Sequence, residues 1–507
     1  MQSQNEPMPP ASNPSDPSST LLSENTAGRF PRQVPFILGN EACERFSFYG
    51  MRSVLATYLT SATVVAAAGS GVWPGLGMKE ENALYIVHAF IAASYGSGLI
   101  GAWLADRFWG RYKTILYISL LYCAGHGILF LSDFSSSTSY KIWCLGAGLV
   151  LIAFGAGGIK PCVSSFMGDQ FDPGQKRLIE RAFGAFYWCI NLGSFFAFLA
   201  IPYVRDHHGY GIAFAIPGIL MAVATFVFWL GRDRYRHAPL ATGPGFWKVF
   251  FFALTGREKR PGDAFWSAAR RRFGNEKIAE ISDMLRAIRP FLFIPPFWAL
   301  YDQNSSTWIM QGNQMEKIRL GGDFVINADQ IQAANPVLIM VLVPVFSFFL
   351  YPFFGKFATP LRRMGFGMFL AAVSFALVGW LQMRIEAGET LSLAWQLAPY
   401  VLLTAGEVLV SVTGLELSYT MAPKTMKSTV GSFWLLTVLA GQLIVMLVTK
   451  LIGAAAQAGD VKVVTSGRFF LFAMLLGATA LVFALAMSFF KQDPAGLSND
   501  DGQPLSK

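Results

Sequence analysis

The sequence predicts an all-α membrane protein with twelve transmembrane helices arranged as two sets of six. Hydrophobic residues make up 53% of the 507 residues and charged residues only 14%, whereas a soluble domain carries roughly a quarter charged residues. Twelve apolar stretches reach the ~20 residues that a helix needs to cross a bilayer core about 30 Å thick. The one long polar interval, about 232–287, separates the sixth stretch from the seventh. A set of soluble domains is therefore excluded.

The expected spans follow the apolar stretches in chain order. They are 34–62, 82–105, 113–132, 142–167, 181–203, 212–231, 288–310, 328–354, 364–385, 393–421, 428–449 and 468–490. An even number of spans puts both termini on one side, and cytoplasmic loops accumulate Lys and Arg. Most of the 40 basic residues lie in the two tails, the central segment and the loops that share that side. We therefore expect both termini in the cytoplasm, and topology explains the net charge of +9 better than nucleic-acid binding does.

Five segments follow from this pattern. Residues 1–33 form a cytoplasmic tail, which is expected to be disordered because its first 28 residues are rich in Ser, Pro, Asn and Gln and lack a signal-peptide pattern. The two six-helix bundles cover 34–231 and 288–491, and a second tail covers 492–507. The linker, 232–287, is expected to hold a short surface helix at 245–256 and an amphipathic helical stretch at 263–289. Secondary transporters share this plan, although channels and membrane enzymes also fit it.

The five cysteines do not predict a disulfide or a metal site. Each lies in an apolar stretch, and none has a CxxC spacing. We expect no metal and no cofactor.

Charged residues inside the first span mark a functional face, because ionisable groups are costly in lipid. Glu41, Arg45 and Arg52 fall within about 60° of one another at 100° per residue, and Glu44 and Tyr49 widen this face to about 140°. Glu41 and Arg45 are four residues apart and can pair. A purely structural ion pair would leave the second carboxylate and the second arginine unexplained.

Two sets of motifs resemble known families. GAWLADRFWGRYKTIL (101–116) resembles the loop motif of the major facilitator superfamily; its Asp106 could gate transport or only stabilise a turn. NEACERFSFYG (40–50) fits ExxERFxxYG, the signature of the proton-coupled oligopeptide transporter family within that superfamily. Four further stretches resemble that family in the same order: FGAGGIKPCVSSFMGDQF (154–171), FYWCINLGSF (186–195), FWALYDQNSSTW (297–308) and GEVLVSVTGLELSYTMAP (406–423).

The resemblance implies a major facilitator fold and symport of di- and tripeptides with protons by alternating access. It implies that the protein interacts with peptides, protons and the lipid bilayer. We expect a monomer in a bacterial inner membrane. A symporter of the same fold for another small anion or metabolite, such as nitrate, is the alternative. A membrane enzyme is disfavoured because no HExxH, GxSxG or histidine cluster is present. A channel is disfavoured because charges of both signs would share one cavity.

The resemblance also assigns roles to individual positions. For proton coupling it implies Glu41, Glu44, Arg45, Asp302 and His88. For peptide binding it implies Arg45, Tyr49, Arg52, Tyr95, Lys160, Tyr187, Asn191, Trp298, Asn335, Glu407, Ser411 and Trp434, with Glu407 on the amino-terminal side of the peptide. For gating it implies Asp106, Arg52 and Asp302. The chemistry agrees, because a peptide is a zwitterion whose ends need a cation and a carboxylate from the protein.

Several assignments leave alternatives open. Lys160 could instead extend to the cytosol as a structural lysine, and His88 could be a packing histidine rather than a proton relay. We favour pairing of Asp302 with Arg52 or Lys160 as a proton-linked outer gate over a static salt bridge. Glu416, nine residues after Glu407, faces the opposite side of its helix and is expected to be structural or part of an inner gate.

The sequence also departs from the family pattern. Phe48 replaces a tyrosine that many members carry, which removes one hydroxyl. The chain lacks both the large insert between spans 9 and 10 of animal members and the two extra spans in the linker of many bacterial members. These features favour a compact bacterial transporter.

Overall fold

The computed structural model describes residues 30–61, 74–172, 175–240, 244–256, 258–260, 262–321, 325–420, 427–455 and 463–486. Residues 1–29 of the tail expected at 1–33, and the whole tail expected at 492–507, lie outside the described residues.

The first bundle consists of helices α2 to α6. Their bounds are α2 Val34–Thr60, α3 Glu80–Leu104, α4 Gly110–Leu131, α5 Thr138–Gly168 and α6 Lys176–Leu230. A π-helical turn, Ala105–Trp109, joins α3 to α4. The fifth and sixth predicted spans lie in α6, which consists of two helices that meet at a kink at Gly209, where φ is 83°. This kink lies within the predicted connection, 204–211, and glycine adopts its conformation without steric cost.

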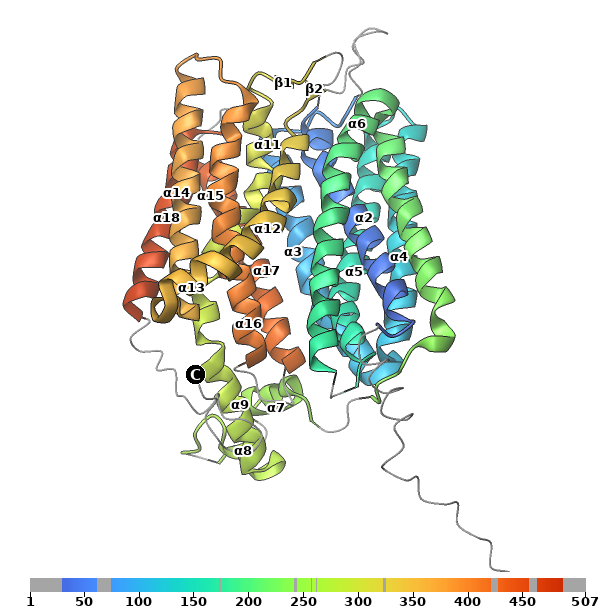
Figure 1. Ribbon diagram of the computed structural model, residues 1–507, viewed down its shortest axis with the longest axis vertical. Coiled ribbons are helices and arrows are strands. Elements are labelled where there is room, and N and C mark those ends of the chain that lie inside the picture. The colour runs from blue at the N-terminus through green and yellow to red at the C-terminus, as the bar shows by residue number, and fades with distance from the viewer. Residues whose placement is uncertain are drawn as a thin grey trace, which may run out of the picture.

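The linker holds three short helices at one end of the molecule (Figure 1). They are α7 Phe246–Leu254, α8 Ser267–Phe273 and α9 Asn275–Ala287. Both helical stretches expected in the linker are confirmed. The expected position of α7 at the membrane surface stays a prediction. Phe246 and Trp247 of α7 pack against Phe433, with ring centroids 5.4 and 5.7 Å apart, so the linker contacts the second bundle directly.

The second bundle is more interrupted than the first. Its elements are α10 Pro295–Tyr301, α11 Thr307–Gly312, α12 Ala334–Val345, α13 Tyr351–Phe354, α14 Pro360–Glu386, α15 Leu397–Glu407, α16 Thr413–Thr420, α17 Lys427–Ala455 and α18 Ser466–Ala486. Strands β1, Ile318–Arg319, and β2, Val325–Ile326, pair antiparallel. This hairpin lies at the end of the molecule opposite the linker (Figure 1). We call the two ends the hairpin end and the linker end.

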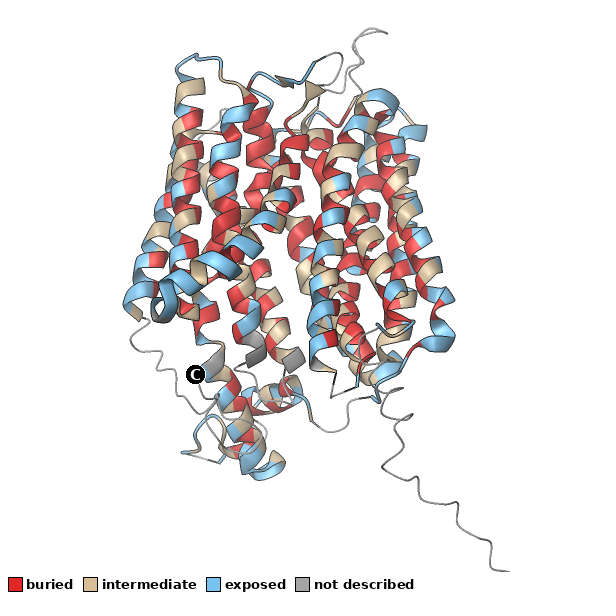
Figure 2. Cartoon of the chain, viewed as in Figure 1, coloured by how far each residue is buried: buried red, intermediate tan, exposed pale blue. Residues whose placement is uncertain are grey.

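Helical segments of the described chain lie in all twelve predicted spans. Eight stretches of the described chain are long and apolar enough to cross a membrane, and two of them, Glu80–Phe134 and Arg177–Leu230, each contain two predicted spans. The first span, α2, carries four charged residues, and the seventh is broken near Asp302. Figure 2 shows the exposed surface on the outside of both bundles and the buried surface between helices. Exposed side chains such as Trp143, Phe348 and Phe353 are aromatic, as expected for a surface that faces lipid.

Glycine permits close contact within the first bundle. A Cβ atom at Gly101 of α3 would collide with the backbone of Gly158 of α5. The Gly110 backbone has φ of 72° where α4 begins. Gly101 thus lets α3 and α5 approach closely, and Gly110 permits the turn into α4.

Candidate functional site

A cavity of about 220 Å³ lies between the two bundles. Eleven of the residues expected at the site line it: Tyr49, Arg52, Tyr95, Tyr187, Asn191, Trp298, Asp302, Asn335, Glu407, Ser411 and Trp434. Arg45 and Lys160 are not among the lining residues. The fold thus brings together positions that are up to 385 residues apart in the chain.

The charged cluster of α2 lies next to this cavity. Nε of Arg45 is 2.6 Å from Oε1 of Glu41 and 2.9 Å from Oε2 of Glu44, which confirms the predicted Glu41–Arg45 pair. Both carboxylates are at most 1% exposed. Oε2 of Glu41 and Oε1 of Glu44 have no hydrogen-bond partner among the described residues. Each of the two carboxylates therefore has an oxygen that no donor in the described chain satisfies.

Lys160 contacts the ring of Tyr95, a residue that lines the cavity. Its Nζ atom is buried, makes no hydrogen bond within the described chain and lies 3.8 Å from the centre of the Phe48 ring and 4.4 Å from that of Tyr95. The alternative that Lys160 extends to the cytosol is therefore wrong. Aromatic faces attract a cation, so Phe48, the residue that replaces a tyrosine, here contacts this ammonium.

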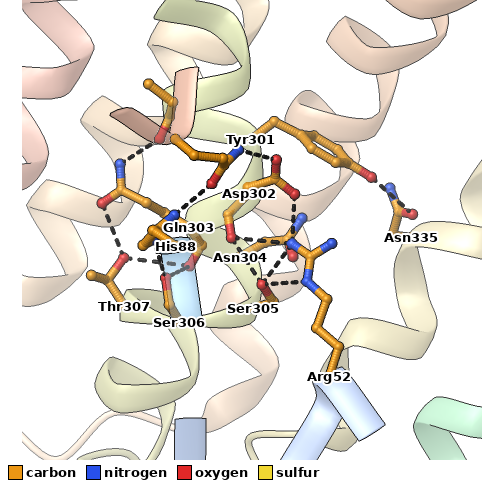
Figure 3. A network of polar contacts seen from close by, with 12 residues as sticks. Arg52, His88, Tyr301, Asp302, Gln303, Asn304, Ser305, Ser306, Thr307 and Asn335 are labelled. Atoms are coloured by element: carbon orange, nitrogen blue, oxygen red, sulfur yellow. Dashed lines mark hydrogen bonds and ion pairs between the residues drawn. The ribbon is translucent and has the colours of Figure 1, made fainter. Parts of the chain in front are cut away.

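Arg52 and Asp302 join the two bundles at the cavity (Figure 3). Nη2 of Arg52 is 2.5 Å from Oδ1 of Asp302, and Nε and Nη2 of Arg52 donate to Oγ of Ser305 at 2.9 and 2.7 Å. The pairing with Arg52 is confirmed, and the alternative pairing of Asp302 with Lys160 is absent from the described contacts. Asp302–Ser305 forms a 3₁₀ turn between α10 and α11. This break points the Ser305 hydroxyl at the same guanidinium that Asp302 binds.

His88 belongs to the same network through Gln442, a residue that sequence reasoning missed. Nε2 of Gln442 donates to Oδ2 of Asp302 at 2.5 Å, and Oε1 of Gln442 lies 2.6 Å from Nδ1 of His88. Nε2 of His88 is 3.1 Å from Oγ of Ser306. His88 and Gln442 are both fully buried. The signal was present in the sequence, since Gln442 is an amide within an otherwise apolar span.

Glu407 provides the negative side of the cavity. Its Oε2 accepts a 2.7 Å hydrogen bond from Nδ2 of Asn335, which also donates to Oγ1 of Thr404 at 3.1 Å. Glu407 and Ser411 both line the cavity, whereas Glu416 does not. Glu416 is half-exposed and lies 3.6 Å from Arg363. The expectation that Glu407 and Glu416 face different environments is confirmed.

Aromatic side chains form one wall of the cavity. The rings of Trp298 and Trp434 are 6.1 Å apart, and Nε1 of Trp298 donates to Oγ1 of Thr437 at 3.1 Å. Asn191 is tied through Nδ2 to the carbonyl of Tyr187 at 2.9 Å. Oγ of Ser411 has no hydrogen-bond partner in the part of the chain that the structure describes. It is therefore available to a ligand.

The chain matches the POT family model over residues 112–464. It belongs to the POT family. It is 38% identical to peptide transporter family 1 of Drosophila melanogaster over 373 residues, which cover 70% of this chain and 48% of that protein. It is 34% identical to human solute carrier family 15 member 2 over 402 residues, which cover 75% of this chain and 52% of that protein. The chain thus spans about half the length of the curated relatives it matches.

Solved POT family structures share this fold. A crystal structure described as an auto-inhibited POT family peptide transporter has 39% identity and a TM-score of 0.76, with 90% of this chain and 97% of that one covered. The crystal structure of the POT family transporter PepTSo has 38% identity and a TM-score of 0.79, with 92% and 99% covered. The predicted major facilitator fold and family are confirmed.

A second set of contacts joins the bundles of this POT family chain at the hairpin end. Arg205 contacts Asp329, and Thr57 donates to Oδ2 of Asp329 at 2.9 Å. Nδ2 of Asn327 donates to Asp206 at 2.5 Å. Sequence reasoning missed these residues because they lie at predicted span ends, where charged residues are common. They show that the hairpin end is closed by polar contacts.

The 101–116 motif contains an arginine that forms an ion pair. Arg111 of α4 pairs with Asp169, which directly follows α5, at 2.5 Å, and Asp106 lies on the π-helical turn Ala105–Trp109. The gating role of Asp106 stays a prediction.

Proposed function

We propose that this POT family member is a proton-coupled symporter that imports di- and tripeptides by alternating access. One observation carries the proposal: Arg52 from the first bundle and Glu407 from the second line the same cavity. A zwitterionic ligand would place its carboxylate towards the cation and its ammonium towards the anion. Such a ligand bridges the two bundles, so its binding is linked to their relative motion.

The size and walls of the cavity support a short peptide. Its volume of about 220 Å³ is below the range of roughly 300–1,000 Å³ typical of sites for drug-sized ligands. Protein groups that hold both ends of the peptide limit its length, because each added residue moves the peptide ammonium further from the peptide carboxylate. Trp298 and Trp434 offer apolar surface that tolerates different side chains.

The charged groups next to the cavity support coupling to protons. Glu41, Glu44 and Arg45 share one buried cluster, and Asp302 closes the cavity with Arg52. We propose that a proton on Asp302 weakens this pair and allows the hairpin end to open. His88 is the proposed relay. Lys160 and Arg45 would reach the peptide carboxylate after the bundles move, since neither lines the cavity as described.

The remaining assignments follow from this function. We propose a multi-pass protein of a bacterial inner membrane with both termini in the cytoplasm, two bundles at 34–231 and 288–491, and a cytoplasmic linker at 232–287. It would act as a monomer without a cofactor and would not be an enzyme. The linker is rich in Lys and Arg, which accumulate on the cytoplasmic side. The linker end would therefore face the cytoplasm.

Uptake into proteoliposomes tests the proposal. Labelled dialanine is supplied with and without an inward proton gradient, and unlabelled di-, tri- and tetrapeptides and nitrate are added as competitors. Gradient-dependent accumulation that di- and tripeptides block supports the proposal. Competition by nitrate alone, or no accumulation by folded protein in the vesicles, refutes it. Protein-free vesicles and vesicles treated with a protonophore serve as controls.

A further inference from the structure

We infer that Gln442 is a positioning residue that fixes the tautomer of His88 and links its protonation to the charge of Asp302. This inference rests on the proposed proton coupling, because it concerns how the coupling groups communicate. His88 and Asp302 do not contact each other directly in the structure. The side-chain amide of Gln442 stands between them, 2.6 Å from Nδ1 of His88 and 2.5 Å from Oδ2 of Asp302.

The orientation of the amide follows from the charge of Asp302. Oδ1 of Asp302 pairs with Arg52, and the carboxylate of such an ion pair can only accept hydrogen bonds. The NH2 group of Gln442 must therefore face Asp302. Its carbonyl oxygen then faces His88, and a carbonyl can only accept.

The tautomer of His88 follows from that orientation. Nδ1 of His88 must carry the hydrogen that the Gln442 carbonyl accepts. In a neutral imidazole the other nitrogen, Nε2, is then bare and acts as an acceptor. Oγ of Ser306, 3.1 Å away, can donate to it. A proton arriving at His88 would therefore bind at Nε2, on the side of Ser306.

This arrangement links the protonation of Asp302 to that of His88, although the two side chains do not contact each other. If Asp302 takes up a proton, it becomes a donor and the amide of Gln442 can turn over, so that NH2 faces His88. Nδ1 must then be bare, and His88 loses the acceptor that favours its charged form. Two other charged residues, Arg52 and Arg468, act on His88. Both are cations, so each disfavours a further positive charge on His88. Protonation of Asp302 and of His88 would therefore be mutually exclusive.

Removal of the amide should have a defined direction. In Gln442→Met the neutral His88 can move its hydrogen to Nε2 and donate to Ser306, whereas the charged form leaves Nδ1–H without an acceptor. The neutral form is therefore favoured. We expect the pH of half-maximal dialanine uptake to fall by about one unit, which is the effect of about one hydrogen bond.

Two more variants separate this role from a structural one. Gln442→Glu keeps the size, and a protonated carboxyl there can donate to Asp302 while its other oxygen accepts from Nδ1 of His88, so the pH of half-maximal uptake should stay near that of the wild type. Gln382→Met removes another buried amide, which bonds Gln311 at 3.0 Å within the second bundle, and should also leave the pH profile unchanged. Equal pH profiles for wild type and Gln442→Met would overturn the inference.

A spectroscopic measurement tests the tautomer without transport. The full-length protein labelled with ¹⁵N-histidine distinguishes protonated from bare ring nitrogens, and His88→Gln identifies the signal of His88 among the five histidines. We expect Nδ1–H in the wild type and Nε2–H in Gln442→Met. Nε2–H in the wild type would refute the inference. If the wild type shows no proton-driven uptake, the proposed function fails while the spectrum still decides the role of Gln442.

Discussion

Replacement of Asp302 by asparagine tests whether the pair with Arg52 holds the hairpin end closed. Asp302 is 2% exposed and accepts two hydrogen bonds of 2.5 Å, one from Arg52 and one from Gln442. Asparagine has nearly the same shape and is neutral, as a protonated aspartate would be. It can still accept from Arg52, but its NH2 group opposes that of Gln442 until the Gln442 amide turns over and accepts from it.

The size of the effect follows from these contacts. A hydrogen bond to a charged group contributes about 1.5–3 kcal/mol, against about 1 kcal/mol between neutral groups. Weakening both bonds costs the closed state about 1–4 kcal/mol, against ~3–5 kcal/mol for breaking a buried pair outright. The ratio of closed to open molecules should therefore fall roughly 5- to 900-fold.

Distances between spin labels across the hairpin end measure this ratio. Labels are attached to cysteines introduced at His208 and Ala387, which are exposed and lie one on each bundle, after replacement of the five native cysteines. The asparagine variant should populate longer distances than the parent. Glu389→Gln removes an exposed carboxylate that pairs with Arg384 and should change nothing. Identical distance distributions for Asp302→Asn and the parent would refute the reasoning.

Three further variants test other parts of the structure. Glu44→Gln should lower gradient-driven accumulation of dialanine at least tenfold, because a buried carboxylate that lacks a full set of donors is replaced by a group that cannot take up a proton. Glu407→Gln should raise the peptide concentration for half-maximal uptake about 10- to 100-fold, since it removes one charged hydrogen bond to the peptide ammonium. Gly101→Val should lower the melting temperature in detergent, because its side chain meets the backbone of Gly158, whereas Gly127→Val, with no atom within 4 Å of its Cβ position, is the matched control.

Each of these variants has a result that contradicts its basis. Wild-type accumulation by the Glu44 variant would remove that residue from proton coupling. An unchanged concentration dependence for the Glu407 variant would mean that the peptide ammonium binds elsewhere. Equal melting temperatures for the two glycine variants would contradict the close contact between α3 and α5.

The sequence alone was sufficient for features that depend on neighbours along the chain. Twelve apolar stretches predicted the helices, because the length of a span is set by the bilayer and not by other helices. The Glu41–Arg45 pair is separated by one helical turn, so the helix itself brings the two side chains together. The same reasoning separated Glu407 from Glu416. The motif from Asn40 to Gly50 indicated the family.

Tertiary structure decided which polar groups meet across the two bundles. The contact of Gln442 with His88 joins residues 354 positions apart, and Arg205 meets Asp329 across 124 positions. No periodicity within one helix can encode such a pair, because it depends on how the helices pack and on where a helix is broken, as at Asp302–Ser305. The sequence left open whether Lys160 is buried or extends to the cytosol, because its contact with two aromatic rings also depends on how the helices pack. Local sequence sets which faces are polar, and only packing in three dimensions sets the partner that each buried charge receives.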